Sequence, residues 1–222
     1  ILANMEIRGI KIDNTFLKEL SLKFEKKIKL IQKEVFKISK KDFNIASTKQ
    51  LGEILYNDLK IADLKKTKKG SFATSASVLE DLAFKGHEFP KLVLDWRQVS
   101  KLKNTYSDSL PEHINPKTKR VHTSFLLAAT TTGRLASSDP NLQNIPIKSE
   151  DGKDIRKAFI AKKDHVLISA DYNQIEMRIL ADLADVKELK KAFKNNEDIH
   201  SLTASQIFNV DIKKVNQDQR RK

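Results

Sequence analysis

The sequence predicts an α+β fold, in which a helical first half is followed by a half that mixes strands and helices. Two observations support this prediction. Apolar residues recur at helical spacing over two long stretches of the first half. Short strand-like runs bounded by turn residues occur only after about residue 114.

The first long helix is predicted over residues 13–40. Asp13 is a suitable N-cap, because its carboxylate accepts a hydrogen bond from an amide in the first turn. The apolar residues behind it are three or four apart, and lysines and glutamates fill the other face. The stripe consists of Leu17, Leu20, Phe24, Ile28, Ile31, Val35 and Ile38.

Shorter helices are predicted between the two long ones. Ser47 with Gln50 is a capping signal for a helix that reaches about Lys60, and Ser77 with Glu80 is a second such signal. Between them, residues 65–71 form a basic loop that contains a glycine. We interpret this loop either as a solvated surface loop or as a tip that binds phosphates.

A second long helix is predicted over residues 88–110, where Pro111 ends it. Two long helices with compact material between them indicate an antiparallel pair that carries a small tip. The apolar face of the second helix consists of Phe89, Leu92, Val93, Trp96, Val99, Leu102, Tyr106 and Leu110.

The second half changes from helical to alternating patterns. A strand is predicted over residues 120–127, and residues 158–161 and 165–170 are predicted to form a hairpin. After Asp171 the apolar residues return to helical spacing, which predicts a further helix.

The composition favours a polyanionic partner. The 222 residues include 42 Lys+Arg and 29 Asp+Glu, a net charge of +13 that is spread over both halves. A lysine-rich proteome is an alternative source of this charge. Cysteine is absent, which excludes disulfides and thiolate metal sites. No apolar run is long enough to cross a bilayer, so we expect no membrane partner and a cytoplasmic location.

The sharpest chemical motif surrounds Asp171. An apolar strand is predicted to deliver this carboxylate where a helix begins, and Mg²⁺ prefers such oxygen ligands. The backbone carbonyl of Tyr172 is a neighbouring second ligand, and Glu176 follows on the helix. The alternative interpretation is that Asp171 simply caps the helix.

A long polar loop over residues 130–146 is the second motif. Its donors are Arg134, Asn141, Gln143 and Asn144. The minor groove presents acceptors at nearly the same place for every base pair, so such donors suit binding without sequence preference. The alternative is an ordinary surface loop whose polar groups are satisfied internally.

The third motif lies near the end of the chain, where Asp198 and His200 precede a pair of arginines at Arg220 and Arg221. Arginines at a helix start suit phosphate binding. The alternative is an ordinary basic terminus.

Several strings in one order resemble family A DNA polymerases of the bacterial DNA polymerase I type. They are TGRLASSDPNLQNIP, ISADYNQIEMRIL, DIH followed by DQRRK, FNIASTKQLGEIL and WRQVSKLKNTYSDSLPEHINPKTKRVHTSF. The resemblance covers essentially the whole chain and implies a right-hand architecture. Residues 1–113 would form the thumb with its tip at about 43–86. Residues 114–185 would form the first part of the palm, with the catalytic motif at 167–180, and residues 186–222 would begin the fingers.

The resemblance also implies roles for individual residues. Asp171 and the Tyr172 carbonyl would bind the catalytic metal, with two Mg²⁺ ions in the complete site, and Glu176 would be the steric gate against ribose. Gln174, His200 and Arg220 would contact the incoming deoxynucleoside triphosphate. The expected primer–template contacts are Arg134, Asn141, Gln143, Asn144, Lys101, Lys103, Asn104, Thr105 and Arg178.

We expect the chain to be a monomeric, incomplete piece of a DNA polymerase. The family's second catalytic carboxylate motif is absent, and Lys222 does not occupy the catalytic lysine position. Because two-metal phosphoryl transfer requires both carboxylates, we expect the chain alone to be inactive. A phage-type RNA polymerase is an alternative that Glu176 disfavours. A non-catalytic module that binds primer–template DNA is the other alternative.

Overall fold

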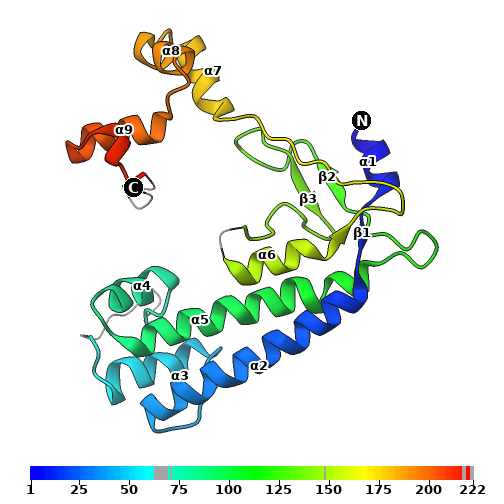
Figure 1. The fold of residues 1–222 in the computed structure, drawn as a ribbon. Helices are drawn as coiled ribbons and strands as arrows, with labels where there is room; N and C mark the ends of the chain where they lie inside the picture. Colours follow the sequence, from blue (N-terminus) through cyan, green and yellow to red (C-terminus); the bar gives the residue numbers. More distant parts are fainter. Residues whose placement is uncertain (63–69, 71, 148, 217–218, 221–222) are drawn as a thin grey trace. The chain divides into compact units, whose positions relative to one another are not determined.

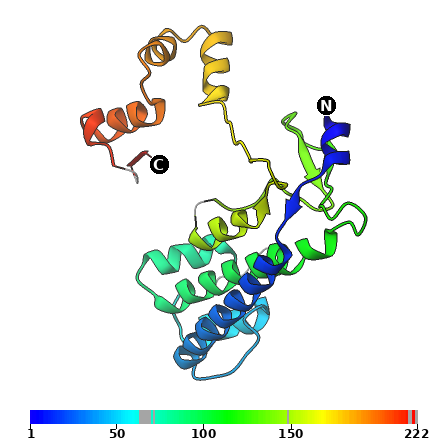
Figure 2. The same cartoon turned by 45° about the vertical axis from the view of Figure 1, so that its right-hand side comes forward.

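The computed structural model describes residues 1–62, 70, 72–147, 149–216 and 219–220. The chain divides into two compact units, Ile1–Leu167 and Ile168–Lys222. Figure 1 and Figure 2 show the elements of each unit. The basic segment 65–69, together with Arg221 and Lys222, lies outside the described residues.

The first long helix forms as predicted. After α1 (Leu2–Arg8) and β1 (Lys11–Ile12), α2 spans Asn14–Ser39. The Asp13 carboxylate accepts a hydrogen bond from the Phe16 amide at 3.0 Å, which confirms the predicted N-cap. The helix ends where Lys40 adopts the left-handed conformation with φ 53°.

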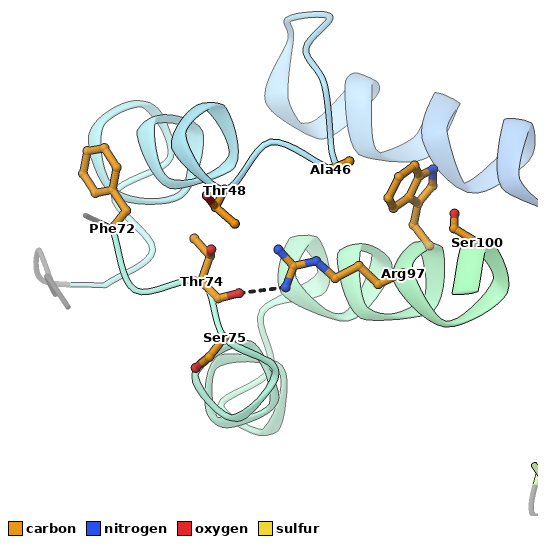
Figure 3. A pocket seen from close by; sticks show the side chains of 8 residues that line it. Ala46, Thr48, Phe72, Thr74, Ser75, Arg97 and Ser100 are labelled. Atoms are coloured by element: carbon orange, nitrogen blue, oxygen red, sulfur yellow. Dashed lines mark hydrogen bonds between the residues drawn. The ribbon is translucent and has the colours of Figure 1, made fainter. Parts of the chain in front are cut away.

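The tip contains α3 (Thr48–Gly52), which continues as a π-helical turn over Glu53–Asp58, and α4 (Ala76–Phe84). Ser47 caps α3 as predicted, because its hydroxyl accepts from the Gln50 amide. The predicted cap at Ser77 is wrong: α4 begins after Ser75, and Ser77 lies inside the first turn. Figure 3 shows how Arg97 joins the tip to the long helix by donating to the Thr74 carbonyl at 2.7 Å.

The second long helix is less regular than predicted. The α-helix α5 spans Glu88–Leu102, a π-helical turn follows over Lys103–Asp108, and a 3₁₀ turn covers Leu110–His113. Pro111 is therefore the second residue of this last turn and does not end the helix, and the first turn of a helix tolerates its missing N–H. Figures 1 and 2 show α2 and α5 packed side by side and antiparallel, as the two stripes predict.

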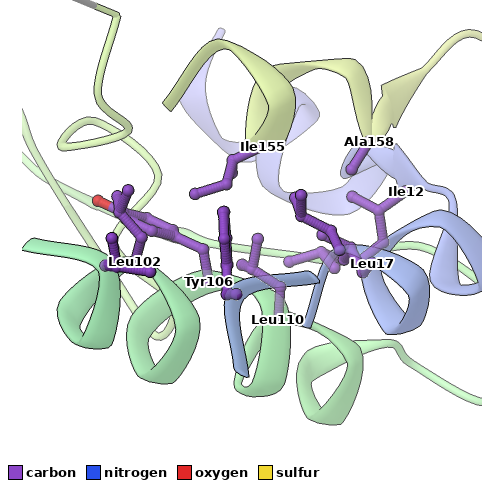
Figure 4. Close-up of a cluster of buried hydrophobic side chains, with 11 residues drawn as sticks. Ile12, Leu17, Leu102, Tyr106, Leu110, Ile155 and Ala158 are labelled. Carbon is purple, nitrogen blue, oxygen red and sulfur yellow. The ribbon is translucent and has the colours of Figure 1, made fainter. Parts of the chain in front are cut away.

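The described residues of the first unit form two hydrophobic clusters that stabilise it. One lies at the tip and joins α2, α3, α4 and α5. The other joins the opposite end of the helix pair to residues from the second half of the chain, including Val121, Ile155 and Ala158 (Figure 4). Ile155 belongs to α6 (Glu150–Lys157), a short polar helix that the sequence analysis did not anticipate. The predicted thumb and the adjoining predicted palm residues thus share one core.

In the described part of the chain, the strands form two small antiparallel sheets. β2 (Ser124–Leu126) pairs with β3 (Ala136–Ser138), and β1 pairs with β4 (Phe159–Ile160). The predicted hairpin of 158–161 with 165–170 is wrong, because β4 pairs with β1 and residues 165–170 form no strand. Without a partner strand among the described residues, this segment is solvent-exposed, with Val166 77% and Ile168 86% exposed. The buried strand expected before Asp171 is therefore not observed.

The second unit is helical. It contains α7 (Ile175–Leu183), α8 (Lys187–Lys194), α9 (Ile199–Phe208) and a 3₁₀ turn at Ile212–Lys214. The helix predicted after Asp171 is confirmed, but its apolar stripe is not buried, and Leu183 is 82% exposed. Within the described part of the chain, no helix is long and apolar enough to cross a membrane.

Candidate functional site

A groove of about 670 Å³ in the first unit brings together two sets of predicted DNA contacts. Lys101 and Thr105 come from the second long helix, whereas Asn141, Gln143 and Asn144 come from the polar loop. All five residues are exposed in addition to lining the groove. One cation and several amide and hydroxyl groups therefore face a single hollow, although about forty positions of chain separate the two strings.

Hydrogen bonds from the buried Tyr106 and the exposed Arg156 hold the loop in place. The Tyr106 hydroxyl donates to the Asn144 carbonyl, and burial raises the pKa of this phenol, which keeps it protonated as a donor. Arg156 of α6 donates to the carbonyls of Ile145 at 3.0 Å and Pro146 at 3.2 Å. The backbone of the loop is therefore fixed, while the side chains of Gln143 and Asn144 stay exposed.

Gly152 permits this close packing of α6 on the loop. A Cβ atom at this position would lie 2.7 Å from the Cβ of Pro146 and 2.9 Å from its carbonyl oxygen. Only glycine avoids that overlap without moving the backbone. The groove therefore depends on a residue that does not itself line it.

Lys103 differs from the other predicted contacts of this helix. Its ammonium donates to Asp108 at 2.7 Å, and Asp108 also accepts from the Ser21 hydroxyl of α2 at 2.6 Å. Burial would raise the pKa of Asp108, but the bonds from Lys103 and Ser21 outweigh this effect and hold it below its usual value. Lys103 thus holds the carboxylate that joins the two long helices, whereas Asn104 is exposed.

Arg134 lies in the exposed loop between β2 and β3 and does not line the groove. The hydroxyl of Thr130 donates to the Arg134 carbonyl at 2.8 Å, which closes this loop. The structure therefore places Arg134 in the first unit but outside the groove that the five other predicted contacts line.

The sequence analysis did not single out a second hollow near the tip. It has a volume of about 520 Å³, and its lining includes Phe72, Thr74, Trp96, Arg97 and Ser100 (Figure 3). Burial lowers the pKa of the Arg97 guanidinium. The Trp96 indole nitrogen and the Ser100 hydroxyl are buried and have no hydrogen-bond partner within the described ranges. The sequence signal that could have indicated this hollow was the string WRQVSKLKNTY, in which Arg97 stands four residues before Lys101.

In the second unit, Asp198 brings together two of the predicted nucleotide contacts. Its carboxylate accepts from the Gln174 side chain at 2.9 Å and from the Arg220 guanidinium. The Arg220 bond lowers the pKa of Asp198 to about 2, against the opposing effect of burial. Gln174 and Arg220 also line a pocket of about 260 Å³ with Asn173, Arg178, Asn196, Glu197 and Asp198.

Arg178 makes contacts within the second unit. Its Nε donates to the Asn173 carbonyl at 2.8 Å, and its guanidinium carbon lies 4.4 Å from the centre of the Phe193 ring. The cation–π contact joins α7 to α8. His200 stands at the start of α9, where its backbone amide donates to Asp198 and its side chain is exposed.

Asp171 and Tyr172 lie in the exposed segment that precedes α7, and Tyr172 is 80% exposed. The alternative that Asp171 caps this helix is wrong, because Gln174 occupies the N-cap position in the left-handed conformation. Glu176 is exposed in the first turn of α7. Among the described residues, no group of three or more His, Cys, Asp or Glu side chains is placed to hold a metal ion.

Comparison with known proteins decides the family. The model of DNA polymerase family A matches residues 14–222. The chain belongs to DNA polymerase family A. This result confirms the family and the α+β polymerase fold predicted from the sequence motifs.

Individual relatives agree with this assignment. DNA polymerase I of Rhizobium leguminosarum is 50% identical over 222 residues, which are 100% of this chain and 22% of the relative. DNA polymerase I of Caldicellulosiruptor bescii is 49% identical over 220 residues, which are 99% of this chain and 26% of the relative. The family A chain thus spans about a quarter of the length of these curated relatives.

A solved family A structure has the same fold. The POL domain of Pol1 from M. smegmatis, in complex with DNA primer-template and dNTP, matches with a TM-score of 0.87 and 39% identity. The match covers 99% of this chain and 39% of that chain.

Proposed function

We propose that this chain contributes the duplex-binding groove and the first catalytic carboxylate of a DNA-directed DNA polymerase. The intact enzyme would add deoxynucleotides to a primer 3′-OH on a DNA template, in replication and repair. The observation that supports this most directly is the groove in which Lys101 and Thr105 face Gln143 and Asn144. The solved relative that carries primer-template and dNTP supports the same partners for this chain.

The groove suits duplex DNA because of its chemical groups. The ammonium of Lys101 would neutralise a phosphate, and the amides of Gln143 and Asn144 would donate to minor-groove acceptors that every base pair offers. Such contacts position a duplex without reading its sequence. The Asn141 side chain is less free to contact a duplex, because its Oδ1 already accepts a hydrogen bond from the backbone N–H of Gln143 at 3.0 Å.

The proposed catalytic residues lie in the second unit. Asp171 and the Tyr172 carbonyl are hard oxygen ligands of the kind Mg²⁺ prefers, and a bound metal would stabilise charge on the transferring phosphoryl group. The described residues provide no cluster of ligands around them, so by themselves they do not complete a two-metal site. Glu176 would exclude a ribose 2′-OH, and Gln174, His200 and Arg220 would contact the triphosphate.

The domain assignment follows from the same proposal. Residues 1–113 would form the thumb, residues 114–185 the first part of the palm and residues 186–222 the beginning of the fingers. We propose a monomer that acts on nucleoid DNA in the bacterial cytoplasm. The chain alone would bind DNA but would not extend a primer, because the described residues place no cluster of metal-binding side chains around Asp171.

A primer-extension assay tests the activity. We expect the intact enzyme to extend a DNA primer with deoxynucleotides in Mg²⁺, and the 222-residue chain to bind the same primer–template without extending it. If the intact protein binds DNA but extends no primer, the alternative of a non-catalytic binding module is correct. Preferential use of ribonucleotides would instead indicate an RNA polymerase.

A further inference from the structure

Asp198 accepts four hydrogen bonds within the described part of the second unit. It accepts hydrogen bonds from the Gln174 side chain at 2.9 Å, the Ser201 hydroxyl at 3.0 Å and the His200 amide at 3.1 Å, and also from Nε of Arg220. Gln174 and Arg220 come from segments more than twenty residues away on either side. One side chain therefore joins three separate segments of the unit.

The two distant partners are those to which the proposed function gives a role. Gln174 follows Asp171 by three positions and is the N-cap residue of α7, the helix whose first turn carries Glu176. Arg220 is the proposed contact of the triphosphate. The bonds to Asp198 thus connect the segment of the catalytic carboxylate with the cation that would receive the nucleotide.

The geometry leaves Arg220 able to bind an anion. A guanidinium has five N–H donors in one plane, and Asp198 accepts the donor on Nε. The Arg220 side chain is 39% exposed and lines the pocket of about 260 Å³. A phosphate that approaches from this pocket would meet the four donors on the terminal nitrogens, which suit bidentate binding.

We propose that Asp198 is a positioning residue, which orients Arg220 toward the triphosphate of the incoming nucleotide and ties it to Gln174. This inference rests on the proposed function of the chain. An arginine without such a partner samples many rotamers, and ordering them on binding weakens affinity. The lowered pKa of Asp198 agrees with a carboxylate that stays charged beside this cation at neutral pH.

The test is the Asp198→Asn variant of the intact enzyme. Asparagine caps helices as well as aspartate does, so the start of α9 is preserved while the charge that holds Arg220 is lost. We expect the KM for deoxynucleotides to rise about fivefold, the effect of losing one partly exposed ion pair. Neither kcat nor the Kd for primer–template should change by more than about twofold, because Asp198 would not contact the reacting atoms or the duplex.

Asp211→Asn is the matched control. Asp211 caps the 3₁₀ turn of the same unit, where its carboxylate accepts from the Lys213 amide at 2.8 Å, and it is exposed. This variant removes the same charge without touching Arg220, so its KM should equal that of the wild type.

A double mutant separates positioning from a structural role. If Asp198 acts through Arg220, then Asp198→Asn should raise the KM no further in an Arg220→Ala background, although it raises the KM in the wild type. Additive effects would overturn the inference, and so would an Asp198→Asn enzyme whose KM is unchanged or lowered. In those outcomes the wild type still extends primers and the proposed function stands. A wild type that extends no primer would refute both.

Discussion

Two aspartates of the second unit show how the surroundings of a side chain set its chemistry. Asp198 is surrounded by donors, and its pKa is lowered to about 2, primarily by Arg220. Asp171 lies in an exposed, irregular segment ahead of α7. A carboxylate that already accepts four hydrogen bonds is suited to hold other residues in place, whereas an exposed one is accessible to an ion or substrate.

This contrast predicts the effect of Asp171→Asn in the intact enzyme. We expect kcat for nucleotide addition to fall by at least about 10³-fold, because an amide keeps the shape but cannot stabilise the metals that act on the transferring phosphoryl group. The Kd for primer–template should stay within about twofold, because the groove that would hold the duplex contains no part of this residue. Single-turnover extension in Mg²⁺ and fluorescence anisotropy measure the two quantities.

The outcome is decisive in both directions. An Asp171→Asn enzyme with a near wild-type rate would show that this carboxylate is not catalytic. Asp182→Asn is the matched control and should retain activity. Asp182 is an exposed residue of α7 whose Oδ1 lies 3.4 Å from Nζ of Lys190.

Glu176 supports a prediction about sugar choice. In the intact enzyme, Glu176→Ala should increase ribonucleotide incorporation relative to deoxyribonucleotide incorporation by at least about tenfold, because the smaller side chain leaves space for a 2′-OH. Competition between matched ribo- and deoxyribonucleotides on one template measures this ratio. An unchanged ratio would mean that Glu176 is not the steric gate.

At the scale of elements, Asp108 joins the two long helices. It accepts from Ser21 of α2 and from Lys103, where α5 passes into its π-helical turn. The folded-state pKa of Asp108 lies below the usual aspartate value of 3.8, since the two bonds outweigh the effect of burial. A lowered pKa means that the stabilisation is present above pH 3.8 and is lost as the pH falls through the folded-state value.

Asp108→Asn should therefore destabilise the chain at neutral pH by about 1 kcal/mol, discounted for partial exposure. The difference between wild type and variant should shrink as the pH falls below 3.8. Urea unfolding at several pH values from 7 down to acid pH measures this difference in stability. Asp95→Asn, which changes an exposed aspartate of α5, is the control. A difference that stays constant with pH would exclude an ionic role for Asp108.

The elements that sequence patterns predict well are those with local causes. α2 was predictable because its cap at Asp13 and its apolar stripe lie within one stretch of chain. The pairing of β4 was not predictable, because its partner β1 lies near the start of the sequence and the pairing of distant strands leaves no local signal. The same reason explains the exposed segment 165–170, where an apolar run alone resembled a hairpin strand.

The groove shows the same limit for the candidate site. Lys101 and Gln143 were each identifiable from their own strings, but their meeting depends on the Tyr106 bond to Asn144 and on the Arg156 bonds to the loop. Tyr106 lies 38 residues before Asn144, so no local pattern reveals this contact. Likewise, Asp198 was identifiable only as part of the third motif, whereas its bonds to Gln174 and Arg220 required the structure.

At the scale of the whole molecule, the charge of +13 predicts how the 222-residue chain binds DNA. Each phosphate that a lysine or arginine neutralises releases counterions, so log K should fall linearly with log salt, by about 0.9 per contact. We expect the slope of log K against log salt to be about −3 or steeper, with similar values for duplexes of different sequence. Fluorescence anisotropy titrations at several salt concentrations measure the slope.

Lys101→Ala tests whether the groove carries part of this charge. Loss of one phosphate contact should make the slope shallower by about one and should weaken binding to all duplexes equally. Lys117→Ala removes the same charge from an exposed position that does not line the groove, so the slope should stay at the wild-type value. If both variants lower the slope equally, DNA binds through diffuse positive charge and not through the groove. If the slope is flat for the wild type, the lysines of this chain do not bind a polyanion at all.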